Sequence, residues 1–362
     1  MESAGSGSSY SPSRRDCRLI GSTVDIKISG ACGTMLKKAS DILTEYFLLN
    51  NNIDPETMLE VEYVDAAQFL TPGRIDLICK LVYIDSKIND KNVEFARELY
   101  KEHIWSFSRG TFEEPGNENK VSIEDYFTTF DELIESLPRD GISAEKSAVP
   151  VGGDENILDG SHRTAIAIYF HLPLPIVRIP NGESGCNYRY FQSMCLNEIY
   201  LDYIAFQFLQ WAQNCYVAVL WPVGDDAEKM REAEKILDED GALAYKKRIK
   251  LNRRGVEQLV MHAYGHADWI GDSEDGFKGA FSKAVNCYKE DGVTTIYLLQ
   301  GLTPQQVLER KERIREIYQL GKDSIHITDT KEEALLLAQE ALNENSIHLL
   351  NFTGNRSLIG RL

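Results

Sequence analysis

The chain has 362 residues, of which 43% are hydrophobic and 26% are charged, and its formal net charge is −17. Enough apolar side chains are present to build cores, which excludes a largely disordered chain. The acidic balance argues against broad nucleic-acid binding, because that depends on Lys and Arg at the phosphates. No run of 18 apolar residues occurs, so neither a membrane-spanning helix nor a membrane partner is expected.

The first 16 residues are rich in Ser and Gly, and we expect them to form a disordered tail. They contain no apolar core of the kind found in signal peptides. The seven cysteines are irregularly spaced and include no Cys-x-x-Cys pair. These features favour a cytoplasmic protein with reduced thiols, and a disulfide framework or zinc site is the alternative.

Residues 17–105 are predicted to form a helical N-terminal extension. Apolar residues recur at helical spacing in residues 35–51, and further helices are expected at 72–86, behind a Thr71 cap, and at 92–103. Residues 106–120 contain Gly, Glu and Pro without periodicity, which is typical of a loop. A loop of this length inside a domain is often functional.

Residues 106–214 are predicted to form the next domain. A helix is expected at 125–137, ending before Pro138, and a long aromatic helical region at 187–213. Between them the pattern predicts short strands and one further helix. The strands are expected at 147–151, 156–158 and 176–179, and the helix at 164–171.

Residues 215–362 are predicted to form a C-terminal α/β or α+β domain, of ferredoxin-like or small doubly wound type, because strands and helices alternate. We expect His326 on a strand surface. Strands are expected at 216–221, 242–251, 294–299, 324–328 and 346–352, and helices at 226–237, 255–264, 277–288, 304–320 and 330–343.

The segment Asp159-Gly160-Ser161-His162-Arg163 leads from a predicted strand into a helix. A helix N-terminus attracts anions, because its first N–H groups are unpaired and its dipole is positive there. Gly160 allows the backbone to approach a ligand closely, and an Arg side chain can hold phosphate oxygens in a bidentate fork. The segment indicates a phosphate-binding turn. The alternative is a helix start whose Arg pairs with a nearby carboxylate.

The surrounding residues 130–179 resemble the ParB/sulfiredoxin-like superfamily. The matching parts occur in the family's order: Leu133-Ile134-Glu135-Ser136-Leu137 on a helix, Gly141, Val149-Pro150-Val151, Gly152-Gly153, Asp159 to Arg163, and Pro175 to Ile179. The resemblance covers about 50 residues and implies a fold unit from about residue 60 to 185 within an α+β or α/β chain.

The resemblance implies that Gly160, Ser161, His162 and Arg163, with Thr164 behind them, bind nucleotide phosphates. Members of the superfamily include partition proteins that bind CTP, sulfiredoxins that use ATP, and kinases of free serine. Ser161 stands where sulfiredoxins carry their catalytic Cys, which argues against that activity. The chain also lacks the basic helix-turn-helix expected of partition proteins.

We therefore expect a nucleotide-dependent phosphotransferase that uses ATP or another nucleoside phosphate, with Mg²⁺, on an acceptor such as an amino acid, sugar or glycan precursor. Asp159 is the candidate general base and metal contact, or else a plain helix cap. Glu113 and Glu114 are further candidates for proton or metal chemistry, or else solvated loop residues. Arg109 and Lys120 could neutralise phosphate. The alternatives are a non-catalytic nucleotide-binding switch and a ParB-like nucleic-acid-associated protein.

A second polar, Gly-rich stretch follows at residues 264–279. His266 and Asp268 could form a metal-binding or acid/base pair there, and Lys278 could approach a phosphate.

Overall fold

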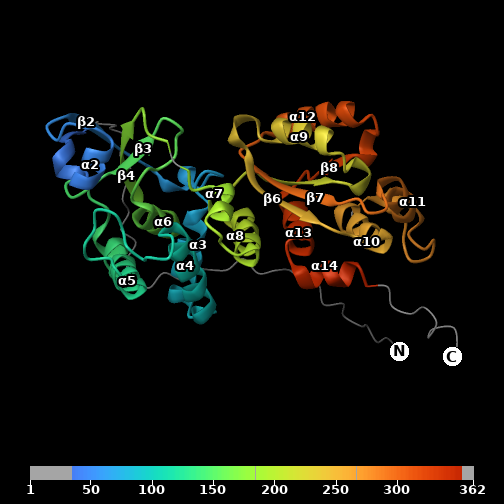
Figure 1. Ribbon diagram of the computed structural model, residues 1–362, viewed down its shortest axis with the longest axis horizontal. Helices are drawn as coiled ribbons and strands as arrows, with labels where there is room; N and C mark the ends of the chain where they lie inside the picture. The colour runs from blue at the N-terminus through green and yellow to red at the C-terminus, as the bar shows by residue number, and fades with distance from the viewer. Residues whose placement is uncertain (1–34, 184, 266, 353–362) are drawn as a thin grey trace, which may run out of the picture. The chain divides into compact units, whose positions relative to one another are not determined.

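The computed structural model describes residues 35–183, 185–265 and 267–352, so the predicted disordered tail and His266 lie outside the described residues. Of the described residues, 53% are helical and 16% lie in strands. The described strands form two separate four-stranded sheets (Figure 1). This confirms the predicted α+β class.

The first sheet has the strand order β1-β2-β4-β3. Its strands are β1 (Met35–Lys38), β2 (Met58–Asp65), β3 (Val149–Gly152) and β4 (Pro173–Ile179). β3 and β4 are parallel neighbours, joined by helix α6 (Ser161–Phe170), whereas β2 pairs antiparallel with β1 and β4. The candidate phosphate turn therefore lies inside a strand–helix–strand unit, at the start of its helix.

Helices surround α6. α3 packs against α4 and α6, and α5 packs against α6. The aromatic core between them includes Tyr100 and Phe130, which are buried. The helices of this half are α1 (Ala39–Ile42), α2 (Glu45–Asn50), α3 (Asp76–Asn89), α4 (Val93–Phe107), α5 (Ile123–Asp140), α7 (Tyr188–Ser193) and α8 (Glu198–Trp211).

The second sheet has the order β6-β7-β5-β8, and every neighbouring pair is antiparallel. The doubly wound alternative is therefore wrong, because that arrangement needs parallel strands. Helices α9 and α12 cover one face, and α10 and α13 the other (Figure 1). The elements are β5 (Cys215–Leu220), α9 (Ala227–Leu237), β6 (Leu243–Ile249), α10 (Arg253–Tyr264), α11 (Lys278–Cys287), β7 (Thr294–Gln300), α12 (Pro304–Tyr318), β8 (Ile325–Ile327), α13 (Lys331–Ala341) and α14 (Glu344–Leu350).

The strand predicted at 346–352 is wrong, because this segment forms helix α14. The side chain of Asn343 accepts hydrogen bonds from the backbone N–H groups of Asn345 and Ser346, which caps the first turn. The prediction that His326 lies on a strand surface is also wrong. His326 is 6% exposed, because helices cover both faces of this sheet.

The prediction of a continuous helix over 35–51 is wrong as well. This segment forms β1 and two short helices, and β2 follows in a stretch for which no strand was predicted. The pairing of β1 with β2, and of β2 with β4, outweighs the local helical spacing here.

Three smaller predictions also fail. Residues 156–158 form only a single bridge, between Ile157 and Val151. The helix expected from residue 72 begins at Asp76, and the hydroxyl of Thr71 bonds the side chain of Asn156 instead of capping it. Helix α5 continues through Pro138 and ends at Asp140.

Candidate functional site

Gly160 is the N-cap residue directly before helix α6, and it has a left-handed backbone conformation with φ +79°. A β-carbon at this position would lie 2.8 Å from Arg163 Nη2 and 2.8 Å from a methyl group of Val149. Both the backbone angle and the close packing require glycine here. Residue 160 therefore places no side chain in front of the N–H groups of the first helical turn.

Arg163 folds back over Gly160, and its Nη1 donates a hydrogen bond to the hydroxyl of Ser147. In the part of the chain that the structure describes, the guanidinium of Arg163 forms no ion pair with a carboxylate. Burial lowers the pKa of Arg163, and the nearby charge of Asp159 offsets this only in part. The result is a fixed cation at a helix N-terminus, which suits an anionic ligand.

His162 lies on the inner side of the turn. Its Nε2 is 2.6 Å from the hydroxyl of Tyr100, and its ring packs edge-on against Phe130 at a centroid distance of 4.6 Å. Burial lowers the pKa of His162 well below its usual value, and the charges of Lys80 and Lys120 lower it further. His162 is therefore neutral near pH 7 and adds no positive charge to the turn.

The other predicted phosphate ligands lie at different depths. Ser161 is half-buried at the first helical position. Thr164 is fully buried, and its hydroxyl donates to the carbonyl oxygen of Gly160 at 3.1 Å. The structure therefore brings Gly160, Ser161 and Arg163 together at the start of α6, while the Thr164 hydroxyl stabilises the turn from inside.

Asp159 is exposed, and its carboxylate accepts a hydrogen bond from the N–H of Gly160. It does not cap α6, because Gly160 holds the cap position and no side chain caps this helix. The plain-cap alternative is therefore wrong. The charge of Asp159 acts on the guanidinium groups of both Arg74 and Arg163, which places the carboxylate near two cations.

A buried ion cluster next to the turn was not predicted. Asp76 accepts from Arg74 Nε and Nη2 at 2.7 and 2.8 Å, and from Lys80 Nζ at 3.1 Å. The three side chains are 2–5% exposed. Burial opposes ionisation of Asp76, but the two cations outweigh it and hold its pKa well below the usual range.

The cluster is joined directly to the candidate turn. Arg74 Nη1 donates to the carbonyl oxygen of Ile157, two residues before Asp159. With two cations and one carboxylate, the cluster keeps a net positive charge close to the turn. The signal in the sequence is Arg74-x-Asp76-x-x-x-Lys80, in which Asp76 and Lys80 have helical i, i+4 spacing.

The loop at 106–120 forms a pocket of about 740 Å³, to which Arg109, Glu113, Glu114 and Lys120 contribute. Glu114 pairs with Lys120 Nζ at 2.9 Å, and Glu113 is exposed. The charge of Lys120 acts on His162, and that of Glu114 acts on Tyr100, so charged groups of the pocket influence side chains on the inner side of the turn.

The structure shows no contact between Asp159 and either glutamate within the described segments. No group of three or more His, Cys, Asp or Glu there is arranged to hold a metal ion. A metal at the turn would have Asp159 as its protein ligand and take its other ligands from phosphate and water, which is a usual arrangement for Mg²⁺.

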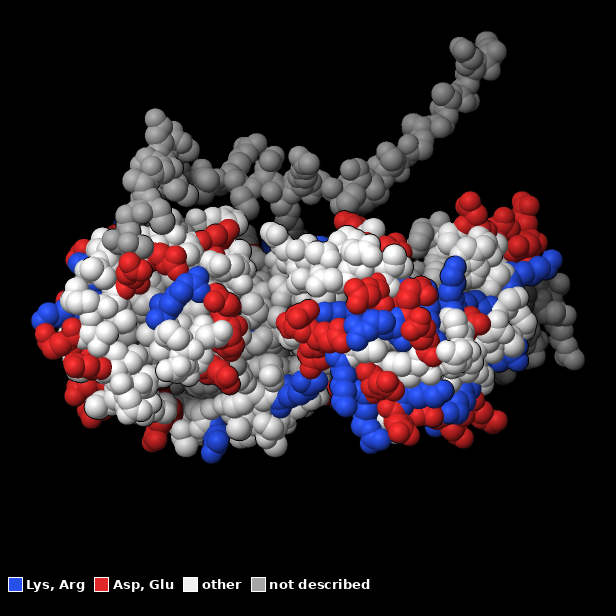
Figure 2. All heavy atoms as spheres, turned by 90° about the horizontal axis from the view of Figure 1, so that it is seen from above, with Lys and Arg blue, Asp and Glu red and all other residues white. Residues whose placement is uncertain are grey.

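On the face drawn in Figure 2, Lys and Arg side chains lie among Asp and Glu side chains and form no separate basic surface. In residues 35–352, apart from the two omitted positions, no helix is both long and apolar enough to cross a bilayer. No disulfide joins the described cysteines. No protein family matches this chain, and no curated protein matches it significantly by sequence.

Proposed function

We propose that this protein is a nucleotide-dependent phosphotransferase that binds phosphates at the N-terminus of α6. The observation that carries the proposal is the guanidinium of Arg163, held over Gly160 without a carboxylate partner among the described residues. Such a cation beside unpaired helix N–H groups forms an anion site. The neighbouring cluster of Arg74, Asp76 and Lys80 adds net positive charge.

The arrangement of elements supports a ParB/sulfiredoxin-like fold for this half. Helix α5, strand β3, the turn at Gly160, helix α6 and strand β4 follow one another in the order of the resemblance, and β3 and β4 are parallel. The second sheet supports a ferredoxin-like fold. Strand β7 separates β5 from β6 and runs antiparallel to both, as expected for a split β-α-β unit.

In the proposed reaction, the first-turn N–H groups and Arg163 bind phosphate oxygens, and Asp159 is the metal contact. Mg²⁺ supplies neutralisation of phosphate charge. Asp159 is the first candidate for accepting a proton from the acceptor hydroxyl, because it is exposed beside the turn. Glu113 is the second, because it is an exposed carboxylate of the loop pocket, whereas Glu114 is paired with Lys120.

The test compares Arg163→Gln with Arg178→Gln in the full chain. Arg178 is an exposed arginine on β4 that pairs with Glu62 and Glu155, so its replacement removes the same charge from a residue with carboxylate partners of its own. Binding of ATP and CTP with Mg²⁺ is measured by calorimetry and thermal shift, and turnover with labelled nucleotide. We expect Arg163→Gln to weaken binding about tenfold or more, since charge-assisted hydrogen bonds to phosphate are lost.

Arg178→Gln should bind nucleotide as the wild type does. Equal affinity of Arg163→Gln and wild type, in a variant that keeps the wild-type circular dichroism spectrum, would exclude the phosphate role of Arg163. Absence of stabilisation by any of ATP, ADP, CTP and GTP would exclude the proposed function as a whole.

A non-catalytic nucleotide switch is the second candidate. The observation that favours it is the separation of the predicted catalytic carboxylates, since Asp159 contacts neither Glu113 nor Glu114 in the described residues. Nucleotide binding without turnover in the presence of amino acids and sugars would support the switch over the enzyme.

A further inference from the structure

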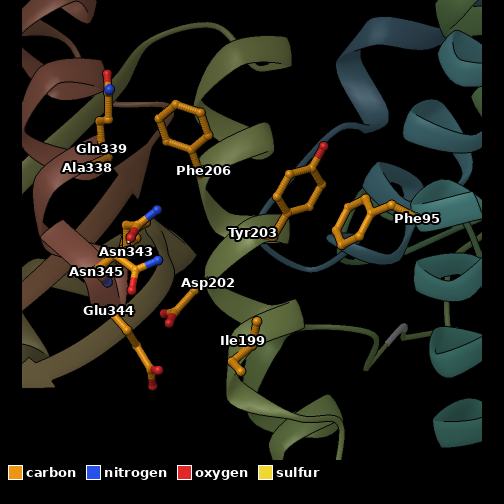
Figure 3. Close-up of a pocket in the computed structure, with 11 residues that line it drawn as sticks. Phe95, Ile199, Asp202, Tyr203, Phe206, Ala338, Gln339, Asn343, Glu344 and Asn345 are labelled. Atoms are coloured by element: carbon orange, nitrogen blue, oxygen red, sulfur yellow. Dashed lines mark hydrogen bonds between the residues drawn. The ribbon is translucent and has the colours of Figure 1, made fainter. Parts of the chain in front are cut away.

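A second pocket, of about 370 Å³, lies between helix α8 and the turn that joins α13 to α14, with Phe95 of α4 at one side (Figure 3). This volume suits a small organic ligand. The pocket shares no lining residue with the candidate phosphate site or with the loop pocket.

Aromatic rings form one side of this pocket. Tyr203 and Phe206 project from α8, and Phe95 meets Tyr203 edge-to-face with ring centroids 4.8 Å apart (Figure 3). Phe95 is 39% exposed, so its ring can be reached from solvent. Ring faces carry partial negative charge and attract cations.

Acidic groups supply the charge of the pocket. Asp202 is 4% exposed; its Oδ1 accepts from the hydroxyl of Tyr245 at 2.9 Å, and its Oδ2 pairs with Lys247. Glu344 is exposed and forms no ion pair in the described part of the chain. Lys247 thus compensates the negative charge of Asp202, whereas the negative charge of Glu344 has no cationic partner among the described residues.

The remaining polar lining includes the amides Gln339 and Asn345, whose oxygens can accept hydrogen bonds from an ammonium group. The amide oxygen of Asn343 is already taken by the N–H groups that it caps. No Lys, Arg or His is among the described residues that line the pocket. An anionic ligand would therefore meet a carboxylate and ring faces without a compensating cation.

We propose that this pocket binds a small organic cation, namely a primary amine attached to an aromatic or short apolar group. The apolar group packs against Tyr203 and Phe206, and the ammonium group is held by Glu344 and the neighbouring amide oxygens. The ligand differs in charge from a nucleotide, so the proposal is independent of the phosphotransferase function.

The test uses three probes that share one ring and differ in the terminal group: tyramine, its alcohol tyrosol, and 4-hydroxyphenylacetate. Affinities for the full-length protein are measured by calorimetry. We expect tyramine to bind about tenfold more tightly than tyrosol, and 4-hydroxyphenylacetate to bind more weakly than either, because a carboxylate partner and ring faces favour the cation.

Two variants make the test specific. Glu344→Gln should weaken tyramine binding about tenfold and leave tyrosol binding unchanged, since only the charge partner is lost. Glu332→Gln removes an equal charge from an exposed position in the first turn of α13, outside the pocket lining, and should change neither affinity.

Asn345→Lys places an ammonium group at the exposed edge of the pocket, so it should abolish tyramine binding and admit 4-hydroxyphenylacetate. Equal affinities for the amine and the alcohol would overturn the proposal. So would a lack of tyramine binding at millimolar concentration, or tyramine binding that Glu344→Gln and Asn345→Lys leave unchanged.

Discussion

The guanidinium of Arg163 occupies the space in front of Gly160, where a β-carbon would approach Nη2 to 2.8 Å. Gly160 and Arg163 are thus packed as a pair at the start of α6. The glycine permits the left-handed turn, and the arginine covers it while bonding Ser147 across the turn. Replacing either residue should disturb the position of the other.

Gly160→Ala should lower the free energy of unfolding by about 2–3 kcal/mol, because the left-handed backbone costs about 1 kcal/mol and the contacts with Arg163 and Val149 add to it. Gly321→Ala is the matched control, since Gly321 also has a positive φ, of +53°, but open space around its Cα. It should cost about 1 kcal/mol. Urea unfolding measures both values, and equal losses would mean that the packing against Arg163 contributes nothing.

Asp76→Asn should destabilise the protein by about 3–5 kcal/mol, because it leaves the buried cations Arg74 and Lys80 without their carboxylate. Asp140→Asn removes a carboxylate from an exposed pair with Arg139 and should cost less than about 1 kcal/mol. Thermal and urea unfolding compare the two. A loss at Asp76 as small as that at Asp140 would show that the cluster does not stabilise the fold.

Tyr100→Phe removes the hydroxyl that bonds His162 Nε2 and keeps the ring in the aromatic core. We expect a loss of about 1 kcal/mol in the free energy of unfolding, the usual net value of one hydrogen bond. Tyr297→Phe is the control, because the Tyr297 hydroxyl is buried without a partner among the described residues. Its removal should be neutral or stabilising, and the reverse order of the two effects would contradict the observed contacts.

His326 should make stability depend on pH. Burial, and after it the charge of Lys311, lower the pKa of His326 to about 3. The unfolded chain takes up a proton at this histidine near pH 6.5, whereas the folded chain does not. The contribution of His326 to the free energy of unfolding is therefore fully present above pH 6.5 and is lost as the pH falls towards 3. Between pH 7 and 5 the loss is about 2 kcal/mol.

His326→Phe keeps a ring against Tyr264 and should remove this part of the pH dependence. Urea unfolding at pH 7 and 5 measures the difference. If wild type and variant lose the same free energy of unfolding between the two pH values, His326 is not buried in its neutral form.

The amino-acid sequence by itself determined the elements whose signals are local. Thr303 and Gln306 form a capping box at the start of α12, and the side chain of Thr330 caps α13. The turn at Gly160 also begins a helix, as its residues indicate, because the glycine and the helix start are neighbours in the chain. The loop at 106–120 lines a pocket, whereas its predicted functional role stays a prediction.

Only the tertiary structure decided which groups meet at that turn. Strand β2 depends on its pairing with β4, more than 100 residues away, and the bond from Arg74 Nη1 to the carbonyl oxygen of Ile157 joins two segments that are 83 residues apart. The contact between Tyr100 and His162 joins two helices far apart in the chain. Such contacts depend on packing between distant segments, whereas caps, turns and helical spacing depend on neighbouring residues.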